Sequence, residues 1–189
     1  EANHTDKRKG HETSEIPPDA AIKGFHSVTL TLNSIRETAD VLSSVFGYQL
    51  VEQEGSLYRY KTDAVENAAI VDLLESPGAP RGINAGGTVH HVAFRVKNEK
   101  EQMAFREKVL KHRLYATEKI DRDYFFSVYF REPGGVLFEI ATDNPGFLTD
   151  ETVEELGNAL QLPDRYEPIR DRIERLLPEL NVSKKSHAH

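Results

Sequence analysis

The sequence has no cysteine and no tryptophan, and its 189 residues include a single methionine, Met103. Without cysteine, disulfide bonds, thiolate metal sites and cysteine nucleophiles are excluded. Long apolar runs are also missing: the stretch 68–74 is interrupted by Asp72, whereas a membrane-spanning helix needs roughly 18 apolar residues. We therefore expect no membrane partner, and a cytoplasmic location is compatible with the lack of cysteine.

Basic residues are in deficit, because 24 Lys and Arg face 31 Asp and Glu and leave a formal net charge of −7. General nucleic-acid binding relies on a basic surface, so we expect no nucleic-acid partner. The remaining composition, 38% hydrophobic and 29% charged, is typical of a globular domain. The chain is long enough to bury a substantial core in one domain or two small ones.

The first part of the chain has no regular pattern. It begins with Glu1 rather than methionine, and no apolar signal segment follows. We interpret the sequence as a fragment, or as a chain whose first part was removed. Residues 1–21 are polar and contain Pro17-Pro18, which predicts a linker or a disordered tail.

Regular patterning starts with an alternating, β-branched segment that predicts a strand at 25–32. Apolar residues then recur at helical spacing over 35–46, after an expected Asn33-Ser34 cap and before Gly47. Three further strands are predicted, and their ranges are 48–52, 56–61 and 68–74. The order of elements is strand, helix, and three strands.

The same order begins again at residue 89, which indicates an internal repeat. We predict a strand at 89–96, a helix at 99–112 with Met103, Phe105, Val109 and Leu110 buried, and strands at 115–119, 125–131 and 135–142. Ser27 corresponds to His91, 64 positions later, and Asp72 corresponds to Glu139, 67 positions later.

The repeat predicts an α+β fold of two tandem βαβββ modules whose sheets curve around a shared cavity. Residues 22–80 form the first module in this prediction, and residues 81–146 form the second. Residues 147–189 are expected to form C-terminal helices and a tail, packed outside the repeat. The two helices are expected at 151–160 and 168–177, and the end at 182–189 is expected to fray.

The second module carries residues suited to metal chemistry. Adjacent strand residues face opposite sides, so His90 and His91 cannot point into one cavity in the same manner. Glu139 lies in the apolar run 135–141, where an unpaired carboxylate is costly. Two histidines and one carboxylate on a face are typical of non-haem Fe(II) oxygenases. A strand histidine pair is also often structural, and a carboxylate in such a run is often ion-paired. Position in the repeat favours the metal interpretation.

Three segments carry the most specific motifs, and they read GGTVHHVAFRV at 86–96, RDYF at 122–125 and YFREPGGVLFEIATD at 129–143. They resemble the vicinal oxygen chelate (glyoxalase/extradiol dioxygenase) superfamily. Within it, they most resemble the C-terminal half of bacterial ring-cleaving hydroquinone dioxygenases. The resemblance extends from about residue 16 to residue 180.

The resemblance implies that His91 and Glu139 are metal ligands for Fe(II), with Mn, Zn or Ni as alternatives. It implies that O₂ opens the ring of a dihydroxybenzene, so the partners are a small aromatic substrate and O₂. Tyr129 would hydrogen-bond a substrate hydroxylate, Arg122 would hold an anionic ring oxygen, and His90 would shuttle a proton. Two simpler roles stay open: Arg122 pairs with a neighbouring aspartate, and Tyr129 is a half-buried strand aromatic.

The first module departs from a complete site, because Ser27 stands where a histidine ligand is expected and His26 should face the other way. The resemblance implies that the third ligand comes from the N-terminal half of the same protein or from a second subunit. Asp72 is then vestigial or structural, and this chain alone is expected to be inactive. Two other functions stay open: a glyoxalase-like non-redox isomerase or lyase, and a metal-free small-molecule binding module.

Overall fold

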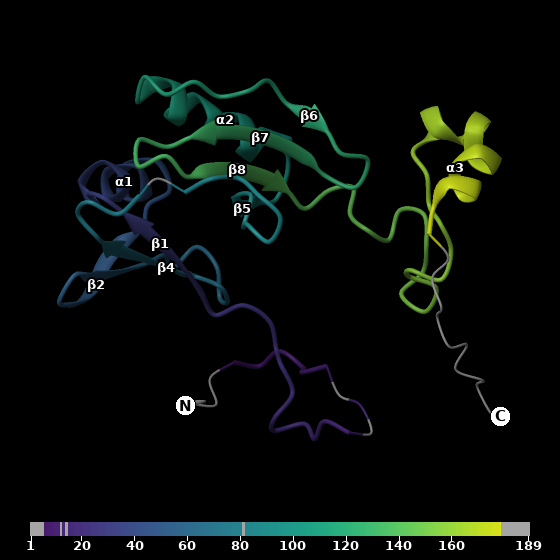
Figure 1. The fold of residues 1–189 in the computed structure, drawn as a ribbon, viewed down its shortest axis with the longest axis horizontal. Helices are drawn as coiled ribbons and strands as arrows, with labels where there is room; N and C mark the ends of the chain where they lie inside the picture. Colours follow the sequence, from purple (N-terminus) through teal and green to yellow (C-terminus); the bar gives the residue numbers. More distant parts are fainter. Residues whose placement is uncertain (1–5, 12, 14, 81, 179–189) are drawn as a thin grey trace. The chain divides into compact units, whose positions relative to one another are not determined.

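The computed structural model describes residues 6–11, 13, 15–80 and 82–178 (Figure 1). The chain divides after Asn144 into two compact units. The predicted frayed segment 182–189 lies outside the described residues. Within the described ranges, each helix is too short or too polar to cross a membrane.

The first module forms a four-stranded sheet with the strand order β1-β4-β3-β2, in which β1 runs parallel to β4. Its strands are β1 (Ser27–Leu32), β2 (Gln49–Glu54), β3 (Leu57–Lys61) and β4 (Ile70–Glu75). Between β1 and β2 lie α1 (Arg36–Asp40) and a π-helical turn, η1 (Val41–Val45). The predicted order of elements is therefore confirmed.

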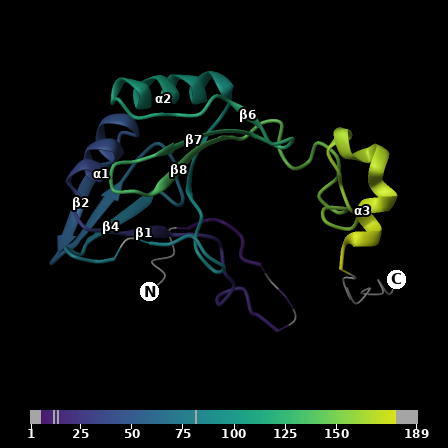
Figure 2. The same ribbon diagram turned by 45° about the horizontal axis from the view of Figure 1, so that its top comes forward.

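The second module repeats this topology, with the strand order β5-β8-β7-β6 and with β5 parallel to β8. Its elements are β5 (Val92–Val96), α2 (Glu99–Lys111), β6 (Ile120–Asp121), β7 (Phe126–Arg131) and β8 (Leu137–Thr142). Figure 2 shows α2 lying along β7 and β8. The prediction of an α+β fold built from two βαβββ modules is confirmed.

One core joins the two modules. Phe46, at the end of η1, stacks on Phe94 of β5 with ring centroids 4.0 Å apart. The Phe46 ring also lies 5.6 Å from that of Phe105 in α2 and 6.1 Å from that of Phe130 in β7. Of the residues predicted as buried in α2, Val109 is fully buried, but Leu110 is 42% exposed. The prediction for Leu110 was wrong because Gln102 occupies the buried helix face instead.

Two local predictions in the modules were wrong. Residues 115–119 form only an isolated bridge, Ala116 to Phe130, because Arg106 of α2 donates to the Thr117 carbonyl at 2.8 Å. The cap predicted for α1 is also absent, since the amide of Ile35 donates to the carboxylate of Glu75 at 3.2 Å. Long-range partners therefore replace the local ones.

The C-terminal unit differs from its prediction as well. Residues 151–160 form turns rather than a helix, and Gly157 there has a φ of +77° that a helix cannot continue through. The second predicted helix is present in shortened form as α3 (Arg170–Leu176), and a 3-10 turn, η2 (Asp164–Ile169), precedes it.

Candidate metal centre

The sheet of the second module has one face against the core and one face away from it. In β8, Phe138 and Ile140 are fully buried in the core, so Glu139 between them points to the other face. Glu139 pairs in register with Tyr129 of β7 and with Ala93 of β5. Three strands thus place their side chains around one carboxylate.

His91 reaches this carboxylate directly. Its Nε2 lies 2.6 Å from Oε2 of Glu139, and the Glu139 side chain is only 3% exposed. The strand begins at Val92, one residue later than His91, so strand alternation does not separate the two histidines as predicted. Their rings instead meet edge to face, with Nδ1 of His90 2.9 Å from Nδ1 of His91.

The second oxygen of the carboxylate has its own partner. The hydroxyl of Ser127, a fully buried residue of β7, donates to Oε1 of Glu139. The carboxylate therefore has a partner at each oxygen, although it sits in an otherwise apolar segment. Sequence reasoning missed Ser127; its position two residues before Tyr129, on the same strand face, was the available signal.

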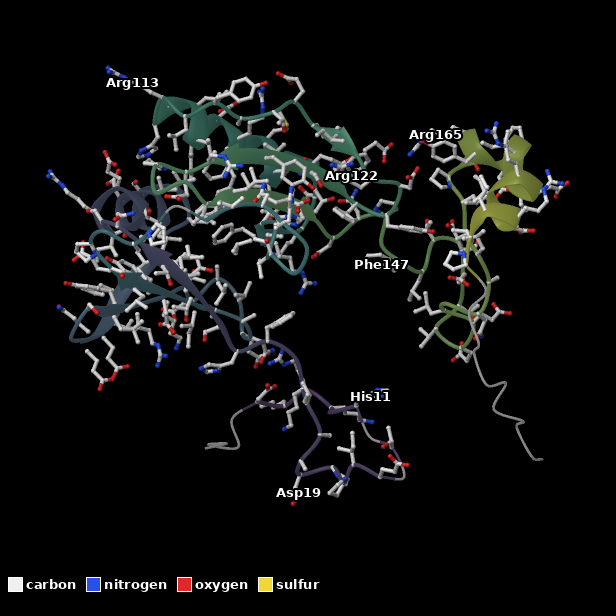
Figure 3. All side chains as sticks on the ribbon, in the orientation of Figure 1. His11, Asp19, Arg113, Arg122, Phe147 and Arg165 are labelled. Atoms are coloured by element: carbon white, nitrogen blue, oxygen red, sulfur yellow. The ribbon has the colours of Figure 1, made fainter. Side chains whose placement is uncertain are left out.

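Tyr129 and Arg122 extend the cluster. The Tyr129 ring lies edge-on to the His91 ring, 5.7 Å between centroids, and the Arg122 guanidinium lies 5.6 Å from the Tyr129 ring centroid. Arg122 comes from the tight turn between β6 and β7 (Figure 3), where Asp123 has a φ of +65°. The structure thus brings together all five predicted site residues.

The corresponding position of the first module has a different arrangement. Asp72 is 3% exposed and pairs in register with Arg59, which donates to both of its oxygens at 2.9 and 3.0 Å. The hydrogen bond with Asp72 raises the pKa of the Arg59 guanidinium above its ordinary value. Asp72 therefore belongs to an ion pair, which agrees with the structural role predicted for it.

The donor set of the second module fits two positions of a metal site. Two ligands bound at about 2.1 Å and at a right angle lie about 3 Å apart, close to the 2.6 Å between the His91 and Glu139 atoms. To leave Nε2 free for a cation, the His91 proton must sit on Nδ1, where His90 can accept it. Among the described residues, no three His, Asp or Glu side chains are grouped for metal binding.

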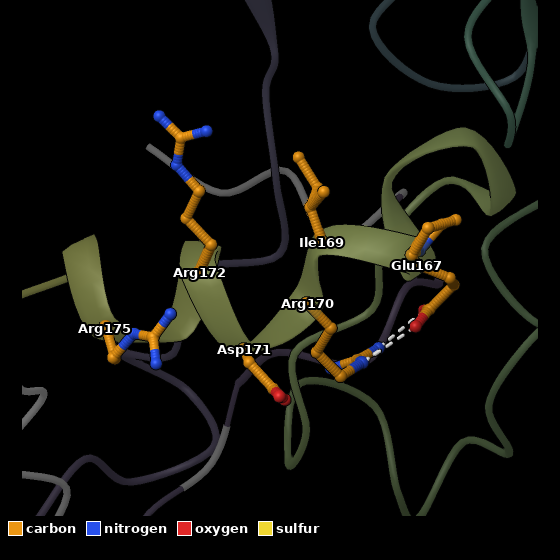
Figure 4. A pocket seen from close by; sticks show the side chains of 7 residues that line it. Glu167, Ile169, Arg170, Asp171, Arg172 and Arg175 are labelled. Carbon is orange, nitrogen blue, oxygen red and sulfur yellow. Dashed lines mark hydrogen bonds and ion pairs between the residues drawn. The ribbon is translucent and has the colours of Figure 1, made fainter.

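Two pockets of the described surface are lined by residues other than those of this cluster. One, of about 50 Å³, is lined by Glu52, Glu54, Leu57 and Arg59 in the first module. The other, of about 310 Å³, belongs to the C-terminal unit, where Arg170 donates to Glu167 at 2.6 Å (Figure 4). No predicted site residue lines either one.

Comparison with known proteins gives a consistent picture. The model of the Glyoxalase/Bleomycin resistance protein/Dioxygenase superfamily matches residues 24–140. A Bacillus subtilis (strain 168) relative named "Putative ring-cleaving dioxygenase MhqO" is 44% identical over 87% of this chain and 52% of its own. The "Chlorohydroquinone/hydroquinone 1,2-dioxygenase" of a Sphingobium indicum strain is 33% identical over 86% of this chain and 51% of its own.

A solved structure supports the same relationship. A crystal structure described as that of a "putative dioxygenase" from Bacillus subtilis matches with a TM-score of 0.83 and 41% identity, over 90% of this chain and 56% of that one. The chain thus spans about half the length of the curated relatives it matches.

Proposed function

The chain belongs to the Glyoxalase/Bleomycin resistance protein/Dioxygenase superfamily, and we propose that it is the metal-binding part of a cytoplasmic ring-cleaving dioxygenase. The proposed reaction is extradiol-type cleavage of a hydroquinone or a related aromatic diol by O₂, with Fe(II) as the metal. One observation carries the proposal: the buried carboxylate of Glu139 faces Nε2 of His91 beside Tyr129 and Arg122. The names of the relatives support the reaction class.

His91 and Glu139 are the proposed ligands from this chain. Fe(II), when bound there, supplies a Lewis acid for a deprotonated diol oxygen and an electron path between ring and O₂. A site with one His and one Glu is incomplete, because the oxygenase arrangement takes two histidines and a carboxylate. The third ligand is proposed to come from another part of the whole protein or from a second subunit.

The surrounding side chains have separate proposed roles. His90 accepts the Nδ1 proton of His91, which holds the His91 ring in the ligand tautomer and makes His90 a proton carrier. The Tyr129 hydroxyl donates to a substrate oxygen on the same face. The Arg122 guanidinium, held against the Tyr129 ring, attracts the negative charge of the bound diol.

The first test is an anaerobic Fe(II) titration of the whole protein that contains this chain, beside its His91→Ala variant. The proposal expects one Fe(II) per chain in the wild type and loss of that binding in the variant. Binding that is indifferent to His91 would contradict the ligand assignment.

The activity is tested on the whole protein that contains this chain. We expect O₂ uptake with substituted hydroquinones, and a loss of at least about 100-fold in His91→Ala. No uptake with any substituted hydroquinone would contradict the dioxygenase. Turnover of a non-diol substrate without O₂ would favour a non-redox isomerase or lyase, and ligand binding unaffected by His91→Ala would favour a metal-free binding module.

A further inference from the structure

Each oxygen of the Glu139 carboxylate has a different partner, and the difference has a chemical consequence. Oε2 faces the His91 ring at 2.6 Å, a distance that a shared cation can replace with two metal bonds. Oε1 accepts from the Ser127 hydroxyl, and this group is on the buried side of the carboxylate. A serine hydroxyl is neutral and donates one hydrogen bond, so it engages one oxygen and leaves the charge available.

The distance between Ser127 and Glu139 is held by a third buried residue. The side-chain amide of Gln102 in α2 donates to the carbonyls of Phe126 and Ile140, each at 2.7 Å. Phe126 directly precedes Ser127 in β7, and Ile140 directly follows Glu139 in β8. Gln102 is fully buried, so α2 ties the two strands together at the level of the carboxylate.

The first module shows what happens when the partner is charged. In the register position of Glu139 it has Asp72, and both oxygens of Asp72 accept from the Arg59 guanidinium. Leu57, which corresponds to Ser127 in strand register, has no hydroxyl to offer. A carboxylate engaged at both oxygens by a cation has neither the free oxygen nor the free charge that a metal ion requires.

We propose that Ser127 is a positioning residue that makes Glu139 a one-oxygen metal ligand. Its hydroxyl holds Oε1, so Oε2 alone is directed toward His91 and the cation. Without it, the carboxylate can turn about its last side-chain bond, where rotamer preferences are weak, and can present both oxygens or neither. This inference rests on the proposed function, because it requires that His91 and Glu139 bind a metal.

The test uses Co(II), whose visible absorption reports its coordination, added anaerobically to the metal-free form of the whole protein that contains this chain. Ser127→Thr keeps the hydroxyl, and Ser127→Val has nearly the same shape without it, so any effect of the added bulk is shared. We expect Ser127→Val and Ser127→Ala to weaken Co(II) binding 10- to 100-fold and to alter the absorption spectrum. Ser127→Thr should bind within a few-fold of wild type with an unchanged spectrum.

A matched control removes another buried hydroxyl from the same sheet. Thr142 of β8 is 6% exposed, and its hydroxyl accepts from the amide of Phe126 and donates to the carbonyl of Asn144 rather than to a carboxylate. Thr142→Val should lower the thermal stability and leave Co(II) affinity and spectrum as in wild type. This comparison separates loss of positioning from general loosening of the sheet.

Two results would overturn the inference in distinguishable ways. If Ser127→Val and Ser127→Ala bind Co(II) as wild type does while His91→Ala does not bind, Ser127 has no positioning role and the proposed function stands. If wild type and His91→Ala take up Co(II) equally, the pair is not a metal site, and the proposed function fails together with the inference.

Discussion

The Glu132→Ala substitution is expected to be among the most destabilising in the chain. Glu132 lies in the turn between β7 and β8 and is 2% exposed. Its carboxylate accepts from the Thr38 hydroxyl of α1 at 2.6 Å, from the amide of Gly134 at 2.8 Å and from the amide of Val136 at 2.7 Å. The same side chain therefore shapes the turn and links the second module to the first.

The expected loss of stability follows from these three hydrogen-bond donors. Each buried donor left without a partner costs about 1–3 kcal/mol, and water entering the space recovers part of that. We expect Glu132→Ala to lower the free energy of unfolding by about 3–5 kcal/mol, a large share of the 5–15 kcal/mol typical of a domain. Glu132→Gln keeps one acceptor oxygen but directs an NH₂ group at the donors that faced the other oxygen. It should lower the free energy of unfolding by about 2–3 kcal/mol.

Urea unfolding followed by circular dichroism measures this effect, because the chain has no tryptophan to report by fluorescence. Glu118 is the matched control: its side chain is 84% exposed and pairs with Arg106 at the surface, so Glu118→Ala should change stability by less than about 1 kcal/mol. A double-mutant cycle with Thr38→Val should show a coupling of at least about 0.5 kcal/mol. A loss below 1 kcal/mol in Glu132→Ala, or additive effects in the cycle, would refute the reasoning.

Three further predictions concern other contacts. A Cβ at Gly134 would lie 2.6 Å from the Thr38 hydroxyl and 2.7 Å from Leu32. Gly134→Ala should therefore lower the free energy of unfolding, measured by thermal unfolding, by about 1–3 kcal/mol. A Cβ at Gly82 meets open space, so Gly82→Ala should leave the stability unchanged. Arg59→Met leaves the buried Asp72 charge unpaired and should lower the free energy of unfolding, measured in urea, by about 3 kcal/mol. A stability equal to that of wild type would contradict this and would mean that water hydrates Asp72. In the whole protein, Tyr129→Phe should lower kcat about 10²–10⁴-fold and leave Fe(II) affinity unchanged, and a parallel loss of Fe(II) would contradict a role toward substrate.

The two metal-ligand candidates were predicted from the repeat together with the resemblance to the superfamily. His91 and Glu139 both lie in the second βαβββ unit, where they correspond to Ser27 and Asp72 of the first, and an acidic residue in an apolar run needs a partner wherever it folds. The structure brings them to 2.6 Å. Their assignment as metal ligands stays a prediction until a metal is titrated.

The failures share a cause. The strand at 115–119, the α1 cap and the helix at 151–160 were predicted from local preference. In the first two cases, the backbone groups instead bind Arg106 and Glu75 from other parts of the chain. A local preference for a strand or a cap does not decide the structure where a long-range hydrogen bond forms at the same position. The Glu-Pro-Gly-Gly segment was predicted as the break between two strands and as part of a family motif, and its contact with Thr38 was not anticipated.

The sequence by itself therefore determined the order of strands and helices within the two modules and the duplication of the module. These depend on periodicity and spacing, which are properties of neighbouring residues. Only the tertiary structure decided that Ser127 donates to the Glu139 carboxylate, that Gln102 donates to the carbonyl of the neighbouring Ile140, and that Arg59 pairs with Asp72 in the first module. These partners meet through strand register and helix packing, which bring together residues 12 or more positions apart and leave no pattern in either segment alone.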